Sequence, residues 1–325
     1  MRTNPKSDDL ATQAISIARD LFGRTPSLRK CQSEVNYCTV LSFDDGTADR
    51  VIKLAKLKPF AIEIEAYLYP RMRKAGLPVP EVEFTNDDYS GAAAPFIVMP
   101  KFSDTTMADL CTESNTSVEA ASASSGRFIN EFHGQFVDEY EDFLSAHRLG
   151  AQKREVNAGL DDLLDFELIR ASDPELLETI EAYLADLTRP ETRHLIHGQP
   201  HTRNIVVNPL GEICVVDFGE SIGMGCPLRD LYMLLTSHDG WARGTGDPSE
   251  RTAIIEGYGG INALEHRELL YWEADRGVVI LNQLLQMADR SGAPDSLSHR
   301  INRSKRNVRR ICSGEGLVTS LPHHQ

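Results

Sequence analysis

The 325-residue sequence lacks several features that would assign it to a specialised class of protein. It has no apolar run near the roughly 18 residues that a membrane-spanning helix needs. Residues 1–9 are polar and lack the apolar stretch of a secretory signal. None of the six cysteines stands in a C-x-x-C pair, so zinc and redox chemistry have no support. We therefore expect a cytoplasmic protein with reduced thiols and no membrane partner.

The chain also has fewer basic than acidic residues. The chain has 34 Lys and Arg residues against 48 Asp and Glu residues, which gives a net charge of -14. Because such a chain repels phosphate backbones as a whole, we expect no nucleic-acid partner. An acidic cleft can attract a cationic small molecule, although most acidic surplus only keeps a protein soluble.

The composition that is present is that of an ordinary globular protein, with 41% hydrophobic and 25% charged residues. The length fits two domains or one large two-lobed unit. The pattern changes from mainly extended to mainly helical near residue 103, so we predict two parts, 1–103 and 104–325. In the first part we predict helices over 8–22 and 60–75 and strands over 35–43, 50–54, 82–84 and 95–99. In the second part we predict helices over 127–136, 160–169 and 175–187, a helical region over 250–312, short strands and loops over 194–218, and a helix start or loop over 113–126.

The last predicted helix, about residues 297–312, is strongly basic. It can be an anion site or a membrane-surface helix. It can also be a basic face packed on an acidic body, with Ile301, Val308 and Ile311 turned inward, and we favour this interpretation. Its basic residues, with no acidic residue between them, are Arg300, Arg303, Lys305, Arg306, Arg309 and Arg310.

Two polar turns adjoin short apolar strands between residues 197 and 219. The run HGQPHTRN, residues 197–204, precedes strand 205–207, and strand 213–216 precedes Asp217. If the two strands pair as a hairpin through the turn at 208–211, Asn204 and Asp217 lie side by side. Two side chains that carry oxygen suit a hard cation such as Mg²⁺, which keeps other positions for water and substrate phosphates.

These segments resemble the catalytic and metal-binding segments of the aminoglycoside phosphotransferase and choline kinase-like enzymes, which are relatives of protein kinases. Their pattern H-G-D-x-x-x-x-N, followed by I-D-F or V-D-F, corresponds here to HGQPHTRN and VVDFG. The segment 225–231 resembles their G-D-P-x-x-D-L, which implies that Asp230 braces the catalytic loop. The resemblance implies an α+β, two-lobed protein kinase-like fold with a β-rich N-lobe and a mainly helical C-lobe.

The N-terminal part carries further motifs in the order of that family. Val51-Ile52-Lys53 is similar to the strand whose lysine holds the α- and β-phosphates, and 76–80 is nearly the family's G-L-P-V-P turn. Glu65 takes the position of the glutamate that pairs with the lysine, and Glu63 is a weaker candidate. The resemblance implies a cofactor site for ATP or GTP, with Mg²⁺ on Asn204 and Asp217. The residues that it assigns to the nucleotide are Lys53, Glu65, Ser33 in the phosphate-covering loop, and Met99 and Lys101 beside the base.

The sequence departs from the family at Gln199, where the family has its catalytic aspartate. A glutamine can orient an acceptor hydroxyl but cannot take its proton. His201 is a weak candidate for that role. The phosphate-covering loop, residues 30–36, also lacks glycine.

The resemblance implies transfer of the terminal phosphate of a nucleoside triphosphate to a hydroxyl of a small molecule that is aminoglycoside-, choline- or natural-product-like. Gln199, His197 and Asp217 take the catalytic positions in this interpretation. The alternative is a pseudokinase or a repurposed nucleotide-binding protein that lacks the general base. The acceptor can be cationic, and Asp161, Asp162, Asp165 and Glu167 are a candidate acidic wall for it, although a solvated helix face is favoured.

Overall fold

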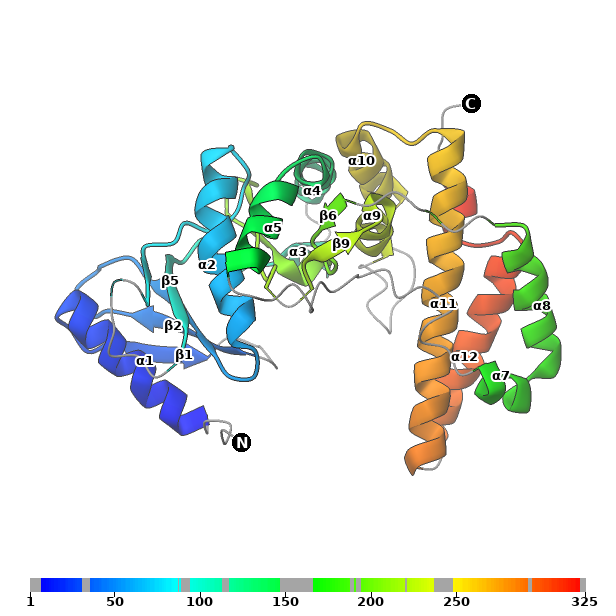
Figure 1. Ribbon diagram of the computed structural model, residues 1–325, viewed down its shortest axis with the longest axis horizontal. Helices are drawn as coiled ribbons and strands as arrows, with labels where there is room; N and C mark the ends of the chain where they lie inside the picture. Colours follow the sequence, from blue (N-terminus) through cyan, green and yellow to red (C-terminus); the bar gives the residue numbers. More distant parts are fainter. Residues whose placement is uncertain are drawn as a thin grey trace.

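The computed structural model of the protein describes residues 7–30, 36–86, 88, 94–112, 117–146, 166–187, 190, 194–219, 221–236, 248–291 and 294–321. Its first part contains a five-stranded antiparallel sheet with the strand order β1-β2-β3-β5-β4 (Figure 1). The strands are β1 Ser27–Lys30, β2 Asn36–Ser42, β3 Arg50–Ala55, β4 Phe84–Thr85 and β5 Phe96–Pro100.

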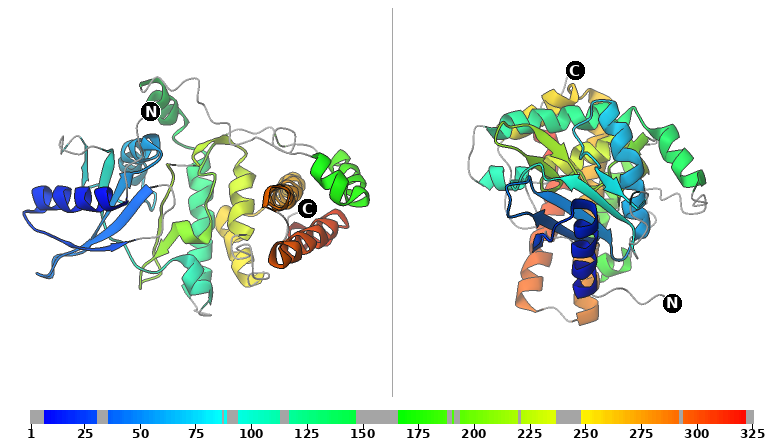
Figure 2. Two further views of the ribbon diagram at one scale, coloured as in Figure 1. Left: turned by 90° about the horizontal axis from the view of Figure 1, so that it is seen from below. Right: turned by 90° about the vertical axis from the view of Figure 1, so that its left-hand side faces the viewer.

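The two faces of this sheet have different coverings (Figure 2). Helix α1, Ser7–Phe22, packs on one face and shares a cluster of buried apolar side chains with Ile52 and Leu54 of β3. Because side chains alternate along a strand, Lys53 lies on the opposite face, toward helix α2. Strand β3 therefore delivers one buried ammonium group to the interior of the molecule.

Helix α2, Pro59–Lys74, begins with proline, whose missing N–H costs nothing in the first turn of a helix. It ends before Gly76, which adopts a φ of 90° and lets the N–H of Leu77 donate to the Met72 carbonyl at 3.0 Å. Its buried face includes Glu65 and Tyr69, which lie one helical turn apart. A carboxyl and a phenol group thus point in the same direction from one helix.

The second part of the chain is mainly helical. Small antiparallel sheets, β6 His194–Ile196 with β9 Gly223–Gly225 and β7 Ile205–Val207 with β8 Ile213–Val215, lie among the helices. Helices α4, α9 and α10 surround them, while α7, α8, α11 and α12 form the far end of the molecule (Figure 1). The helices are α3 Met107–Thr112, α4 Ser117–His133, α5 Val137–Ala146, α7 Phe166–Ser172, α8 Pro174–Ala185, α9 Pro227–Thr236, α10 Pro248–Tyr258, α11 Ala263–Ser291 and α12 Asp295–Cys312, with 3-10 turns η2 Thr202–Asn204 and η4 Val318–Ser320.

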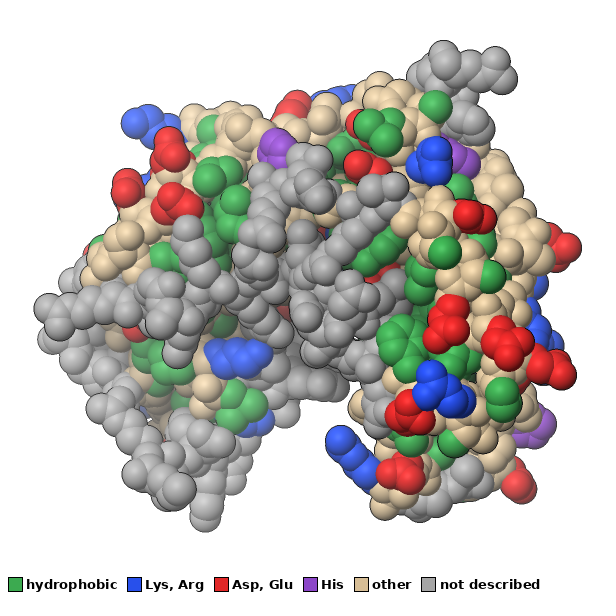
Figure 3. Space-filling model, turned by 45° about the vertical axis from the view of Figure 1, so that its right-hand side comes forward, with side chains coloured by type: hydrophobic (Ala, Val, Ile, Leu, Met, Phe, Trp, Pro, Cys, Tyr) green, Lys and Arg blue, Asp and Glu red, His purple; other side chains and the backbone are tan. Residues whose placement is uncertain are grey.

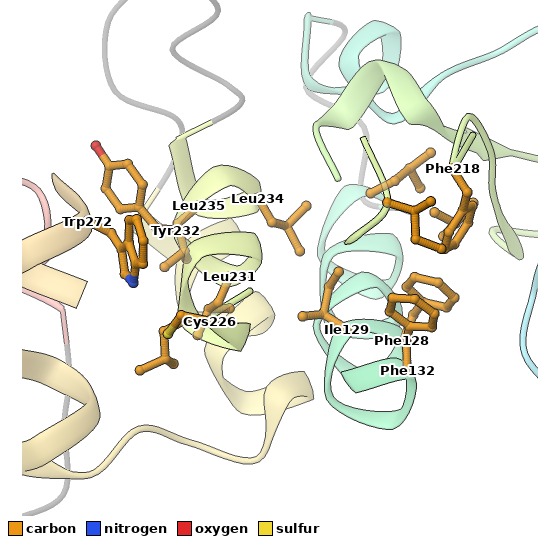
Figure 4. Packing of buried hydrophobic residues seen from close by; sticks show 14 of the residues in the cluster. Phe128, Ile129, Phe132, Phe218, Cys226, Leu231, Tyr232, Leu234, Leu235 and Trp272 are labelled. Carbon is orange, nitrogen blue, oxygen red and sulfur yellow. The ribbon is translucent and has the colours of Figure 1, made fainter. Parts of the chain in front are cut away.

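The main core runs from α2 through the helical part. Figure 4 shows Phe128 and Phe132 of α4 facing Phe218, while Leu231 and Leu235 of α9 belong to the same apolar cluster. All of these side chains are almost completely buried. None of the described helices is long and apolar enough to cross a membrane.

The basic helix packs on the molecule as we expected. Ile301, Val308 and Ile311 of α12 are buried. Asp173, at the start of α8, lies 3.4 Å from the Lys305 ammonium and 2.7 Å from the Arg309 guanidinium. Among the side chains drawn in colour in Figure 3, acidic and basic groups are interspersed over this helical end of the molecule.

The predicted fold class is confirmed, and several predicted boundaries are wrong. Helix α4 runs over Ser117–His133, so of the two alternatives for 113–126 the helix start is confirmed, while the helix predicted over 127–136 begins earlier and ends earlier than we predicted. Strands β1 and β9 and helices α3, α5 and α9 had no sequence prediction. Residues 160–165 of a predicted helix lie outside the described residues. The division of the chain at residue 103 stays a prediction; the last strand of the large sheet ends at Pro100.

Candidate active site

Lys53 stands at the centre of a cluster of charges, in which Lys53 and Glu65 are buried and Asp217 is partly exposed. Its Nζ lies 2.7 and 2.9 Å from the two carboxylate oxygens of Glu65 and 2.6 Å from Oδ1 of Asp217. Burial disfavours the ammonium, but the two carboxylates outweigh this effect and raise the pKa of Lys53 above its ordinary value. Lys53 is therefore charged at any physiological pH and joins strand β3, helix α2 and the Asp217 segment.

Glu65 is the partner that we predicted for Lys53, and Glu63 is not. Glu65 is fully buried, whereas Glu63 is only partly buried. Burial raises the pKa of the Glu65 carboxyl, and the Lys53 ammonium counteracts that rise. Oε1 of Glu65 also accepts the N–H of Gly219 at 3.0 Å. A Cβ on Gly219 would lie 1.9 Å from the Ala61 carbonyl oxygen, so only glycine lets this segment approach α2 so closely.

Asp217 adopts a backbone conformation that is rare for residues other than glycine. Its φ is 69°, in the left-handed region. Its N–H donates to the hydroxyl oxygen of Tyr69 at 3.1 Å. Burial opposes ionisation of its carboxyl, but the neighbouring Lys53 ammonium prevails and lowers the pKa of Asp217. Asp217 thus presents a carboxylate beside the lysine, as a ligand for a cation requires.

Phe218 anchors this segment in the core. Its ring is fully buried and makes edge contacts with Tyr69, Phe128 and Phe132, with ring centroids 5.7, 6.1 and 5.3 Å away. The His197 ring lies 4.2 Å from it. Such aromatic contacts connect α2, α4 and the catalytic loop through one side chain.

Asn204 lies next to Asp217 across the β7–β8 hairpin, as the sequence predicted. The N–H of Val216 donates to the Asn204 carbonyl at 2.9 Å. The Asn204 side-chain amide donates through Nδ2 to the carbonyl of Gln199 at 3.1 Å, so Oδ1 is the side-chain atom left to accept. Among the described residues, no three His, Cys, Asp or Glu side chains form a closed metal cage. One carboxylate and one amide oxygen fit a Mg²⁺ ion whose remaining ligands come from phosphates and water.

Asp230 braces the catalytic loop, as the family resemblance implied. It is fully buried on α9, and its two carboxylate oxygens accept the N–H groups of His197 at 2.7 Å and Gly198 at 2.8 Å. His133 of α4 lies 3.2 Å from the same carboxylate. Gly198 has a φ of 81°, and a Cβ there would lie 2.2 Å from the carbonyl oxygen of Ser221. The loop backbone is therefore held in one conformation just before Gln199.

His197 is a neutral support of this loop rather than an exposed catalytic group. Burial lowers its pKa. Its Nε2 lies 3.0 Å from the Val216 carbonyl oxygen, and its Nδ1 accepts the Gln199 N–H at 3.3 Å. Both contacts fit the neutral ring with its proton on Nε2. Burial and the nearby His197 also lower the pKa of His201.

Gln199 has an exposed side chain on a backbone that is held on both sides. Its N–H contacts His197, and its carbonyl accepts from Asn204 and from the N–H of His201, the latter at 2.8 Å. The amide therefore projects from a rigid loop close to Asn204. This arrangement can orient a hydroxyl, and it offers no carboxylate to accept a proton.

The two residues predicted beside the nucleotide base, Met99 and Lys101, lie in different surroundings. Met99 is buried on β5. The Lys101 N–H donates to the Asp49 carbonyl at 3.0 Å, and its ammonium contacts the carboxylates of Asp49 and Asp104. Both donor groups of Lys101 are thus engaged within the protein. Ser33 lies outside the described residues.

Two residues of the site were missed in the sequence analysis. Tyr69 contacts the N–H of Asp217, and Ser221 donates its hydroxyl to the His197 carbonyl at 2.7 Å. For Tyr69 a signal was present, because it follows Glu65 by one helical turn and so shares its buried face. Ser221 has no such local signal. Glu167 of the predicted acidic wall is exposed and contacts Arg170, while Asp161, Asp162 and Asp165 lie outside the described residues.

Comparison with known proteins assigns the family. Residues 40–271 match the model of the phosphotransferase enzyme family, which is more than half of the chain, so the protein belongs to that family. No curated protein matches the sequence significantly.

Solved structures of small-molecule kinases share the fold. A spectinomycin phosphotransferase in complex with ADP and spectinomycin is 15% identical, with a TM-score of 0.57 over 95% of this chain and 98% of that chain. A microcompartment-associated aminopropanol kinase is 16% identical, with a TM-score of 0.58 over 96% and 99%. An ethanolamine kinase of Plasmodium vivax is 13% identical, with a TM-score of 0.55 over 92% and 90%. These likenesses establish the protein kinase-like fold.

Proposed function

We propose that this member of the phosphotransferase enzyme family moves the terminal phosphate of ATP or GTP to a hydroxyl of a small molecule. The observation that carries the proposal is the charge cluster of Lys53, Glu65 and Asp217, in which both carboxylates lie 2.6 to 2.9 Å from the Lys53 ammonium. Burying the charges of Lys53 and Glu65 is costly unless they are paired. A nucleotide-binding site explains this arrangement, because phosphoryl transfer depends on positive charge and metal ligands that are held in fixed positions.

Each side chain of the cluster has a defined task in this proposal. Lys53 binds the α- and β-phosphates, and Glu65 keeps its ammonium in place. Asp217 and Oδ1 of Asn204 would hold Mg²⁺, which when bound neutralises charge that develops on the phosphates. Asp230 fixes the loop that carries Gln199, and His197 supports that loop as a neutral ring.

Gln199 is the residue that faces the acceptor in this proposal. Because the transition state of phosphoryl transfer is loose, positioning and charge stabilisation supply most of the acceleration. A general base adds about 10²–10⁴-fold. We therefore expect a working enzyme in which the Gln199 amide orients the acceptor hydroxyl and the proton leaves to solvent or to a basic group of the acceptor.

The acceptor is proposed as an amine-bearing alcohol. The net charge of -14 favours a cationic ligand over an anionic one. Spectinomycin, aminopropanol and ethanolamine, named for the structural relatives, are amine-bearing alcohols. The cytoplasm is the proposed location, because Cys214 on β8 is a buried thiol outside any disulfide. The two predicted parts, 1–103 and 104–325, are proposed as the lobes on either side of the nucleotide.

A second candidate function is a nucleotide-binding pseudokinase. The observation in its favour is that no carboxylate occupies the position of Gln199, whose side chain is an exposed amide. Such a protein would bind Mg²⁺ and nucleotide through Lys53 and Asp217 without transferring phosphate.

The experiment that separates the two functions measures turnover of ATP and GTP with a panel of amino-sugar, amino-alcohol, choline-like and nucleoside acceptors. The proteins are the wild type, Gln199→Asp and Gln199→Ala. For an enzyme, Gln199→Asp raises turnover by up to about 10²–10⁴-fold, because it restores the carboxylate that the family pattern has at this position and that can accept a proton. Gln199→Ala raises the KM for the acceptor. Turnover at background for the wild type and Gln199→Asp with every acceptor would favour the pseudokinase.

A further inference from the structure

Two side chains of helix α2 hold the backbone of the Asp217 segment. The Glu65 carboxylate accepts the N–H of Gly219 at 3.0 Å, and the Tyr69 hydroxyl accepts the N–H of Asp217 at 3.1 Å. Glu65 and Tyr69 are 0% and 1% exposed, so neither hydrogen bond competes with water. The Glu65 carboxylate also pairs with the Lys53 ammonium, whereas the Tyr69 hydroxyl hydrogen-bonds to the backbone of Asp217 and to none of these charged groups.

The geometry points to Tyr69 as a positioning residue of the metal site, which acts through its hydroxyl by holding Asp217 in its left-handed conformation. This inference deepens the proposed function and depends on it for the ligand, a Mg²⁺–nucleotide pair. Tyr69 itself touches neither phosphate nor metal in this account. It sets the direction of a carboxylate that does.

The conformation of Asp217 needs such support. A φ of 69° is strained for a residue with a Cβ, and it persists only where the surroundings enforce it. The Asp217 N–H requires an acceptor once it is buried, and the phenol oxygen of Tyr69 supplies one. Without this acceptor the N–H gains by turning toward water, and that turn moves the carboxylate away from Lys53.

The hydroxyl and the ring of Tyr69 have separable effects. The ring packs edge-on against Phe218, with 5.7 Å between the centroids, and a phenylalanine would keep this contact. Burial raises the pKa of Tyr69 well above its ordinary value, so the group is a neutral phenol throughout the accessible pH range. Tyr69→Phe therefore removes one neutral hydrogen-bonding group and leaves the packing in place.

A matched control is available in the same core. Tyr140 on α5 is 2% exposed, and its hydroxyl donates to the Ile222 carbonyl at 3.4 Å. Tyr140→Phe also deletes a buried hydroxyl that contacts backbone, but its partner is the Ile222 carbonyl and not the N–H of Asp217. If the loss of any buried hydroxyl is sufficient, both variants should change. If the hydroxyl acts on the metal site, only Tyr69→Phe should change.

The test combines two measurements on the full chain. The first is amide hydrogen exchange of residues 213–219 in nucleotide-free protein, where we expect Tyr69→Phe to speed exchange of the Asp217 N–H about tenfold. The second is calorimetric titration with a non-hydrolysable ATP analogue, with Mg²⁺ and with EDTA. Tyr69→Phe should weaken binding about three- to tenfold in Mg²⁺ and leave binding in EDTA unchanged. Tyr140→Phe should match the wild type in both measurements.

The outcomes distinguish this inference from the proposed function. Wild-type protein that binds no nucleotide in Mg²⁺ refutes the proposed function, while the exchange measurement still tests the contact of Tyr69. Wild-type binding with no change in Tyr69→Phe overturns the positioning role alone. If Tyr69→Phe lowers the melting temperature more than Tyr140→Phe does, a further titration tells a positioning role from a structural one. It compares proteins that carry Asp217→Ala with and without Tyr69→Phe. There, Tyr69→Phe should have no further effect on binding in Mg²⁺, and an undiminished effect would show a merely structural role.

Discussion

The two sides of the candidate site differ in what their central side chains contact. On the α2 side, the carboxylates of Glu65 and Asp217 both contact the buried ammonium of Lys53. On the loop side, Asp230 and His197 hold the backbone just as firmly, but the side chain that projects from it, Gln199, is exposed. The departure at Gln199 therefore lies on the side that we assign to the acceptor. The side that we assign to phosphate keeps a complete set of charges.

The largest expected effect comes from breaking the charge cluster on the α2 side. Lys53→Met leaves the fully buried Glu65 carboxylate without its ammonium, which should destabilise the fold by about 3 kcal/mol. Urea unfolding measures this change. The double variant Lys53→Met with Glu65→Gln removes the unpaired charge and should recover most of that stability. If the double variant is no more stable than Lys53→Met, the buried charge is not the cause of the loss.

The next largest effect tests how the loop side is held. Asp230→Asn replaces one of two acceptors by a donor that faces a backbone N–H, which should cost about 2 kcal/mol. Asp173→Asn is the matched control, because Asp173 also accepts a backbone N–H, that of Leu176, near the surface. Asparagine caps a helix as well as aspartate does, so this control should lose less than about 1 kcal/mol. Equal losses in urea unfolding would contradict the bracing role of Asp230.

A glycine pair tests the close approach that precedes Gln199. Gly198 and Gly211 have nearly the same φ, 81° and 80°, but only Gly198 has a neighbour that a Cβ would strike. Gly198→Ala should therefore lose about 1–3 kcal/mol more stability than Gly211→Ala, because of the clash with Ser221. Thermal or urea unfolding of both variants measures the difference. Similar losses would mean that the backbone at Ser221 yields easily.

The smallest expected effect is a dependence of stability on acid pH. The pKa of His197 is lower in the folded protein than in the unfolded chain, where it is about 6.5. As the pH falls below that value the unfolded chain binds the proton first, so the stabilising contribution of neutral His197 is present above pH 6.5 and declines below it. Unfolding free energies at pH 7.5 and 5.5 should differ more for the wild type than for His197→Phe. An equal difference in both proteins would refute a buried neutral His197.

Part of this site could be predicted because Asn204 and Asp217 flank two short apolar strands joined by a turn, which indicated the hairpin that the structure contains. The ion pair of Lys53 and Glu65 was implied by the family resemblance, and the structure contains it as well. The left-handed Asp217 and its contact with Tyr69 could not be predicted in the same way, because they arise where α2 and the β8 segment meet in space. Helix α9 was not predicted. Its first residues lie in the segment Gly225 to Leu231, which we interpreted as a family motif and not as the start of a helix with apolar residues at helical spacing.

The α2 side of the site is proposed to bind a nucleotide together with a divalent cation. The most direct test of this binding is calorimetric titration of the wild type with non-hydrolysable ATP and GTP analogues, in Mg²⁺ and in EDTA. We expect saturable binding of at least one analogue that is stronger in Mg²⁺, and loss of that binding in the double variant Lys53→Met with Glu65→Gln. Absence of binding for both analogues, or binding that is the same in EDTA and in the double variant, would contradict this proposal.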